Sequence, residues 1–105
     1  VVYAHAPVER RLYYLYILKL TGKPEWYVGQ TNSLELRLKE HLDGLTQTTQ
    51  GKHPKLVWFK KWVGLYKELL EEESELTRIA TQNPRAIRRM IEEWQKPHRL
   101  VNWDA

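Results

Sequence analysis

The chain has 105 residues, of which 42% are hydrophobic, and it carries a formal net charge of +4. This length fits one domain, and the hydrophobic content is too high for an intrinsically disordered chain. Because cysteine is absent, disulfides and thiolate metal sites are excluded, and a metal would need oxygen or imidazole ligands. No apolar run approaches the roughly 20 residues that span a bilayer, and no signal peptide is visible, so we expect a soluble, cytoplasmic protein without a membrane partner.

The first part of the chain is predicted to form an arm and two strands. Residues 1–10 are mixed in character and are interpreted as an N-terminal arm. The aromatic and apolar run over residues 12–20 predicts a buried strand, and residues 21–24 form a turn signal after it. Residues 26–29 predict a second strand, which the short connection makes antiparallel to the first.

Residues 32–44 carry the signals of a helix with both of its ends. Asn32 or Ser33 is placed to cap the first turn, and Gly44 is placed to end the helix. Apolar residues recur at every fourth position and predict one buried stripe, formed by Leu34, Leu38 and Leu42.

The middle of the chain is predicted to run from a loop through a helix to a strand. The polar residues 45–54 predict a mobile loop. Residues 55–62 are interpreted as a helix, because Leu56 and Phe59 fall on one side of it. Residues 65–70 are interpreted as a third strand, although their intrinsic propensity favours a helix.

Two helical segments are predicted to complete a single domain over residues 1–105. Residues 71–80 predict a helix with an acidic start. Asn83 and Pro84 predict the cap and first position of a last helix, which we expect to end at Pro97. The apolar face of this helix is formed by Ile87, Met90, Ile91 and Trp94. The predicted fold is therefore α/β of the α+β type, with a small three-stranded sheet, mixed or antiparallel, flanked by helices.

Two aromatic triplets lie on the two N-terminal strands, Tyr14-Leu15-Tyr16 and Tyr27-Val28-Gly29, with their last and first tyrosines eleven residues apart. Arg37 follows the second triplet by eight residues. His41 follows Arg37 by four, so both point from the same side of the predicted helix. Asn102 lies near the C-terminus. In this joint spacing the chain resembles the GIY-YIG nuclease superfamily over most of its length. It departs from the pattern in having a tyrosine where the first glycine is expected, and Gln30 where some members carry a lysine.

The resemblance implies a domain that binds DNA and hydrolyses its phosphodiester bonds with one divalent ion, Mg²⁺ or Mn²⁺. It implies that Tyr16 and Tyr27 activate water or position the phosphate, and that Asn102 belongs to the site. It further implies that Arg37 stabilises the charge of the transition state, for which a permanently charged fork is suited. His41 would transfer a proton or contact the phosphate. The ordinary interpretation is that the tyrosines pack in the sheet and that the arginine and histidine form a solvated helix face. The family pattern accounts for all four positions at once.

The metal ligand is the position at which the sequence departs most from the family. The resemblance implies a glutamate on the sheet-facing side of the last main helix, and counting back from Asn102 leads to Met90. A neutral thioether does not hold Mg²⁺ in place of a carboxylate. The chain is therefore a natural non-cleaving member, or carries an inactivating Glu→Met change, or has a shifted register. With a shifted register the ligand is Glu93, or Glu92, which points further toward solvent. The plain alternative is that Met90 fills the core.

The positive charge favours a polyanionic partner, although an ordinary basic protein has the same balance. Candidate contacts to DNA, whether duplex or branched, are the basic residues Lys52, His53, Lys60, Lys61, Arg85, Arg88 and Arg89. Two other functions stay open, namely a non-cleaving nucleic-acid-binding module and a protein-interaction domain. One small domain seldom supplies both specificity and cleavage, so we expect a homodimer or a further domain or partner protein.

Overall fold

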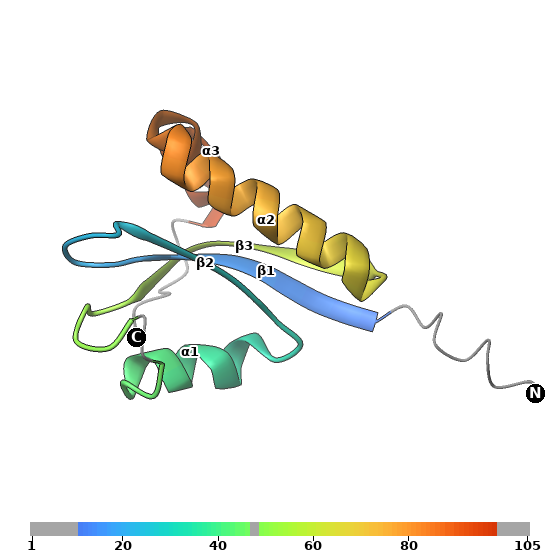
Figure 1. The fold of residues 1–105 in the computed structure, drawn as a ribbon, viewed down its shortest axis with the longest axis horizontal. Helices are drawn as coiled ribbons and strands as arrows, with labels where there is room; N and C mark the ends of the chain where they lie inside the picture. The colour runs from blue at the N-terminus through green and yellow to red at the C-terminus, as the bar shows by residue number, and fades with distance from the viewer. Residues whose placement is uncertain (1–10, 47–48, 99–105) are drawn as a thin grey trace, which may run out of the picture.

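The computed structural model describes residues 11–46 and 49–98 (Figure 1). In chain order they form the elements β1 (Arg11–Lys19), β2 (Trp26–Thr31), α1 (Leu34–Leu42), β3 (Lys55–Gly64), α2 (Tyr66–Gln82) and α3 (Pro84–His98). The three strands make one antiparallel sheet in the order β2-β1-β3. The predicted α+β fold with a small three-stranded sheet is confirmed, and of the two pairings left open, the antiparallel one is found. The predicted N-terminal arm and Asn102 lie outside the described residues.

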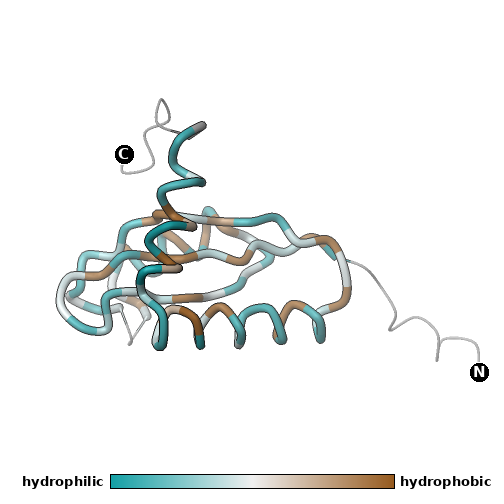
Figure 2. Tube along the Cα trace, turned by 90° about the horizontal axis from the view of Figure 1, so that it is seen from above, coloured by the Kyte–Doolittle hydropathy of each residue, from teal (hydrophilic) through white to brown (hydrophobic). Residues whose placement is uncertain are grey.

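The sheet separates two hydrophobic clusters, because side chains alternate between its faces along each strand. Leu15 and Ile17 of β1 belong to the larger cluster, which is completed by residues of α2 and α3. Tyr16 and Leu18 face the other way and pack with residues of α1. Figure 1 shows α1 on one side of the sheet and α2 on the other, and Figure 2 shows hydrophobic and hydrophilic residues alternating along α2.

The prediction of a helix over residues 55–62 is wrong, because these residues form most of β3. Strand β3 pairs with β1 along its whole length, from Arg11 opposite Gly64 to Lys19 opposite Lys55. A β-bulge explains the misleading pattern. Leu56 pairs with Leu18, Trp58 pairs with Ile17, and Val57 is the extra residue between them. The bulge puts Leu56 and Phe59 on one face although they are three positions apart, which imitates the spacing of a helix.

The prediction of a strand over residues 65–70 is also wrong, because α2 begins at Tyr66 and continues through the predicted helix 71–80. Leu69 and Leu76 are buried seven positions apart, with Ile79 and Ala80 packed beside them. This is the period of an amphipathic helix, and the helical propensity of the segment prevails over its short apolar run.

The ends of the helices follow the predicted signals in most respects. Gly44 has a φ of 74°, its N–H donates to the carbonyl oxygen of His41, and the N–H of Leu45 donates to that of Glu40. This pair of bonds is the Schellman arrangement, so the predicted stop of α1 is confirmed. The Oδ1 atom of Asn83 accepts the N–H of Ala86, which confirms the cap of α3.

Three details of the helix predictions need correction. Ser33 occupies the N-cap position of α1 without a side-chain cap bond. Leu42 is 67% exposed, so of the three predicted leucines only Leu34 and Leu38 pack against the sheet, and both are partly buried. α3 reaches His98, one residue beyond the expected end at Pro97, which is within the usual spread of helix boundaries. Within residues 11–46 and 49–98, no helix has the length and apolar character needed to cross a membrane.

Candidate active site

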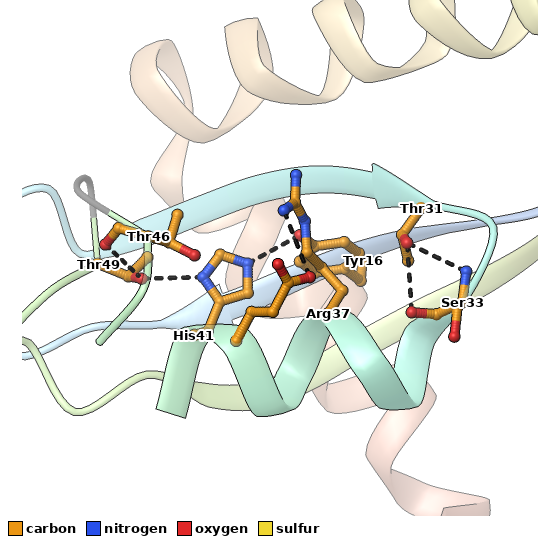
Figure 3. Close-up of polar contacts among 8 residues, drawn as sticks. Tyr16, Thr31, Ser33, Arg37, His41, Thr46 and Thr49 are labelled. Atoms are coloured by element: carbon orange, nitrogen blue, oxygen red, sulfur yellow. Dashed lines mark hydrogen bonds and ion pairs between the residues drawn. The ribbon is translucent and has the colours of Figure 1, made fainter. Parts of the chain in front are cut away.

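A buried pair of polar side chains, Tyr16 and His41, lies between the sheet and α1 (Figure 3). The Tyr16 hydroxyl and the His41 Nε2 atom are 2.9 Å apart, and both side chains are almost completely buried. Burial of two polar groups is tolerated because each satisfies the other. The structure thus joins two of the predicted site residues, which are separated by 25 positions in the sequence.

The glycine of the second triplet makes room for this pair. Gly29 lies opposite Tyr16 in the sheet, and a Cβ atom at position 29 would be 2.5 Å from the Tyr16 hydroxyl oxygen and 2.6 Å from its Cζ atom. A side chain at this position would therefore displace the Tyr16 ring. Glycine is needed at position 29 because the Tyr16 ring lies directly against the backbone there, where a side chain would not fit.

Tyr27 extends the site from the buried pair toward the surface. Its ring centroid is 5.0 Å from that of His41, in an edge-on arrangement, and 6.2 Å from that of Tyr16. Unlike Tyr16, the Tyr27 side chain is only partly buried. The second motif tyrosine is therefore the one of the two that solvent reaches.

Arg37 adds a permanent charge one helical turn before His41. Its side chain is 40% exposed, and its Nη1 atom is 3.7 Å from Oε1 of Glu40. Burial alone would lower the pKa of Arg37, but the adjacent Tyr16 and Glu40 raise it, so the guanidinium stays charged. In Figure 3 the Arg37 side chain rises from α1 beside Tyr16. The guanidinium is thus accessible on one side and tied to the buried pair on the other.

The electrostatics of the pair favour neutral forms of both partners. Burial raises the pKa of Tyr16, Tyr27 raises it further, and the positive charge of Arg37 only partly opposes the rise. Burial lowers the pKa of His41, Arg37 lowers it further, and Glu40 opposes this effect. At neutral pH a phenol therefore faces a neutral imidazole, because neither charged form is well solvated.

A fifth group, Thr49, completes the buried network and is absent from the sequence prediction. Its hydroxyl oxygen is 2.8 Å from Nδ1 of His41, and the residue is fully buried. The loop 45–54 that we predict to be mobile brings it there through turns, in which the Thr49 N–H donates to Thr46 and the Lys52 N–H donates to Thr49. A lone threonine in a polar loop carries no sequence signal for this role.

The basic residues predicted to contact DNA are distributed over several surfaces. Lys61 pairs with Tyr14 in the sheet and so lies on the same face as Tyr16. Lys60 lies on the opposite face, with its ammonium 5.5 Å from the ring centroid of Trp62. Lys52 donates to the carbonyl oxygen of Lys23, at the turn between β1 and β2. His53, with a φ of 49°, lines a groove at this same end of the sheet.

Of the three arginines on α3, two line a groove and one forms an ion pair. Arg85 and Arg89 lie in a groove together with Trp58 and Trp94. Arg88 is instead 3.4 Å from Glu25, which follows the turn after β1. The groove at α3 approaches the site of the tyrosines, because Trp94 packs at 5.3 Å against Phe59, a residue on the Tyr16 face of β3.

The predicted metal positions, Met90 and Glu93, both line the groove at α3 that also holds Arg85 and Arg89. Met90 packs against the larger cluster, with Ile87 and Ile91, on the face of the sheet opposite Tyr16. Glu93 is 66% exposed and pairs with Lys96 on the same helix. Among the described residues, no group of three or more histidine, aspartate or glutamate side chains is placed to hold a metal ion.

A different carboxylate, Glu73 of α2, has the character expected of a ligand. Glu73 follows Leu69 by four positions and precedes Leu76 by three, so it shares their sheet-facing side of α2, which packs mainly against β2. Leu69 and Leu76 belong to the larger cluster, so Glu73, like Met90, lies on the face of the sheet opposite Tyr16. Burial raises the pKa of Glu73, and within the described part of the chain its carboxylate has no ion pair or hydrogen bond. A half-buried carboxylate without a partner is a group that a cation would stabilise.

The fold and the site together define a small α+β domain that holds an accessible arginine and tyrosine over a buried tyrosine–histidine pair. The GIY-YIG catalytic domain matches residues 12–88 of the chain, so the chain belongs to the GIY-YIG family, a family of nucleases. The match includes Glu73 and ends before Met90, Glu93 and Asn102. No curated protein and no solved structure gives a significant match to the chain.

Proposed function

We propose that the chain is a metal-dependent endodeoxyribonuclease domain that hydrolyses phosphodiester bonds in DNA. The observation that carries the proposal is the arrangement of Arg37 and Tyr27, which present an accessible cation and an accessible phenol above the buried pair of Tyr16 and His41. Membership of a nuclease family supports the same reaction.

Exposure separates the roles of the four motif residues. Arg37 contacts the scissile phosphate, where its guanidinium offsets the negative charge that builds up on the phosphate oxygens. Tyr27 positions the attacking water or takes its proton. Tyr16 and His41 are too deeply buried to touch a phosphate, so they hold Arg37 and Tyr27 in place and exchange a proton only with each other.

Glu73 is the carboxylate that would hold the divalent ion. One carboxylate suffices for Mg²⁺, which keeps several of its waters and takes further oxygens from substrate phosphates. When bound, the ion supplies Lewis-acid stabilisation of phosphate charge. With Glu73 as the ligand, Met90 is core filler and its presence gives no reason to expect an inactive chain. Glu93 keeps its role in the pair with Lys96.

Two basic surfaces near the site could contact the DNA backbone. Lys61 lies on the Tyr16 face of β3, and Arg85 and Arg89 line the groove beyond the edge of that strand. Phosphate contacts of this kind add affinity without sequence preference. Specificity then comes from a second copy of the chain, another domain or a partner protein.

A plasmid-nicking assay with Mg²⁺ or Mn²⁺, run beside a gel-shift assay in chelator, tests this function. We expect nicking that chelator abolishes, together with a shift that chelator does not abolish. A chelator-resistant shift without nicking would show a binding module instead. The absence of both would point to a protein-interaction domain and contradict the proposal.

A further inference from the structure

The hydroxyl of Thr49 lies at the far end of a chain of buried hydrogen bonds that begins at Tyr16. Its oxygen is 2.8 Å from Nδ1 of His41 and 3.4 Å from the carbonyl oxygen of Thr46 (Figure 3). On the other side of the imidazole, Nε2 is 2.9 Å from the Tyr16 hydroxyl. Both ring nitrogens are therefore engaged, and the direction of the bonds determines which nitrogen carries hydrogen.

The hydrogen bond from Thr49 to Thr46, although long at 3.4 Å, favours one direction for the chain. The carbonyl oxygen of Thr46 only accepts, so the single hydrogen of the Thr49 hydroxyl is donated to it. The Thr49 oxygen is then left to accept a hydrogen from Nδ1 of His41. A neutral imidazole has one N–H group, so Nε2 carries the lone pair and accepts the Tyr16 hydroxyl hydrogen.

We propose that Thr49 is a positioning residue, whose hydroxyl selects the His41 tautomer that accepts a hydrogen bond from Tyr16. With its hydrogen held by His41, Tyr16 turns the lone pairs of its oxygen toward its other neighbours. The guanidinium of Arg37 is adjacent and donates only, so this orientation holds the arginine in place. The consequence for cleavage rests on the proposed function, whereas the tautomer does not.

Backbone hydrogen bonds hold Thr49 in a fixed position beside His41. Its N–H donates to the carbonyl oxygen of Thr46, and its own carbonyl oxygen accepts the N–H of Lys52. The Lys52 carbonyl oxygen in turn accepts both the N–H and the hydroxyl of Thr21, after β1. A residue held at both ends in this way orients an imidazole more firmly than a mobile loop does.

Nitrogen NMR of the histidine ring tests the tautomer directly, with ¹⁵N-labelled protein at neutral pH in chelator. We expect His41 in the intact protein and in Thr49→Ser to carry its hydrogen on Nδ1. In Thr49→Val, which keeps the shape of the side chain but offers no acceptor, we expect the Nε2–H form to appear. A His41 hydrogen on Nε2 in the intact protein would overturn the proposal. An unchanged Nδ1–H form in a folded Thr49→Val protein would also overturn it.

Single-turnover nicking at saturating DNA then tests the consequence for the reaction. Loss of one oriented hydrogen bond in Thr49→Val should slow nicking about tenfold with DNA affinity unchanged, and Thr49→Ser should restore the rate. Equal rates in the intact protein and Thr49→Val would show that the tautomer does not matter for cleavage. If the intact protein does not nick DNA at all, the proposed function fails while the NMR result still decides the tautomer.

Discussion

At the scale of single residues, exposure divides the motif side chains into two that solvent reaches and two that it does not. Tyr16 and His41 are buried, whereas Arg37 is 40% exposed and Tyr27 is only partly buried. The spacing of these residues predicts from sequence that they belong together, because it follows a family pattern. Their division into an accessible pair and a supporting pair is not visible in the sequence, since it depends on how deep each side chain lies under α1.

Substitution of Arg37 by alanine tests the accessible pair. We expect Arg37→Ala to reduce the nicking rate by about a hundredfold or more, because the guanidinium acts where transition-state charge builds up. DNA affinity should fall by less than about tenfold, since one exposed charge contributes about 1 kcal/mol or less to binding. Single-turnover nicking and gel shifts in chelator measure the two effects.

Arg78→Ala is the matched control, because Arg78 is a similarly exposed arginine that pairs with Glu75 on the surface of α2. It should leave both the rate and the affinity unchanged. Equal losses of rate and affinity in Arg37→Ala would make Arg37 an ordinary phosphate anchor.

At the scale of secondary structure, the elements predicted from the sequence agree with the structure more closely in the N-terminal half of the chain than in the middle. The strands before residue 32, the stop of α1 at Gly44 and the cap of α3 at Asn83 rest on local signals, and the structure confirms them. The predictions for β3 and α2 are wrong because the structure of both segments depends on residues far away in the sequence, against which they pair or pack. The bulge at Val57 is set by pairing with β1, and nothing within residues 55–62 reveals it.

The end of α1 deserves a stability test, because it begins the loop that delivers Thr49. Gly44 has a φ of 74°, and a Cβ atom there would meet only Gln50, at an ordinary 3.8 Å. We therefore expect Gly44→Ala to lower the free energy of unfolding by about 1 kcal/mol through backbone strain alone. For a domain of this size, thermal denaturation should show a decrease in Tm of about 4–8 °C.

Gly44→Asn provides the control, because asparagine tolerates the left-handed conformation better than alanine does. It should recover part of the lost stability. A Gly44→Ala protein as stable as the parent would show that α1 does not end in this conformation in solution.

At the scale of the whole molecule, the buried pair links stability to pH from two sides. The lowered pKa of His41 means that the fold favours the neutral imidazole, so stability is present above about pH 6.5 and is lost as the pH falls. The raised pKa of Tyr16 means that the fold favours the phenol, so stability is present below about pH 10 and is lost as the pH rises. The protein should therefore be most stable between these values.

Denaturant unfolding from pH 7 to pH 5 measures the acid side of this dependence. Glu73 acts in the opposite direction, because its raised pKa favours the protonated carboxyl, so the measurement is best made in Glu73→Gln protein. The stability should decrease toward pH 5, and adding His53→Asn should not alter the decrease, since His53 is exposed. A flat profile, or one that His53→Asn flattens, would contradict the role given to His41.

The count along the chain and the fold lead to different candidates for the metal ligand. Counting back from Asn102 leads to Met90, but Asn102 lies beyond the described residues and beyond the family match at residues 12–88. The fold offers a different candidate, Glu73, a half-buried carboxylate between Leu69 and Leu76 on the sheet-facing side of α2. In the sequence, Glu73 lies within an acidic run, and the neighbouring glutamates look equally suitable as metal ligands.

Exchange of single glutamates for glutamine tests whether this chain cleaves DNA with Glu73 as the carboxylate that holds the metal. Magnesium-dependent nicking is compared in the parent protein, in Glu73→Gln and in Glu93→Gln, after each variant is shown to bind DNA in chelator. We expect the parent and Glu93→Gln to nick at equal rates and Glu73→Gln to be slower by about a hundredfold or more, since loss of metal-assisted charge stabilisation costs several kcal/mol. Nicking that Glu73→Gln retains and Glu93→Gln loses would show that Glu93 and not Glu73 is the ligand, and a parent protein that binds DNA without cutting it would show that the chain is not a nuclease.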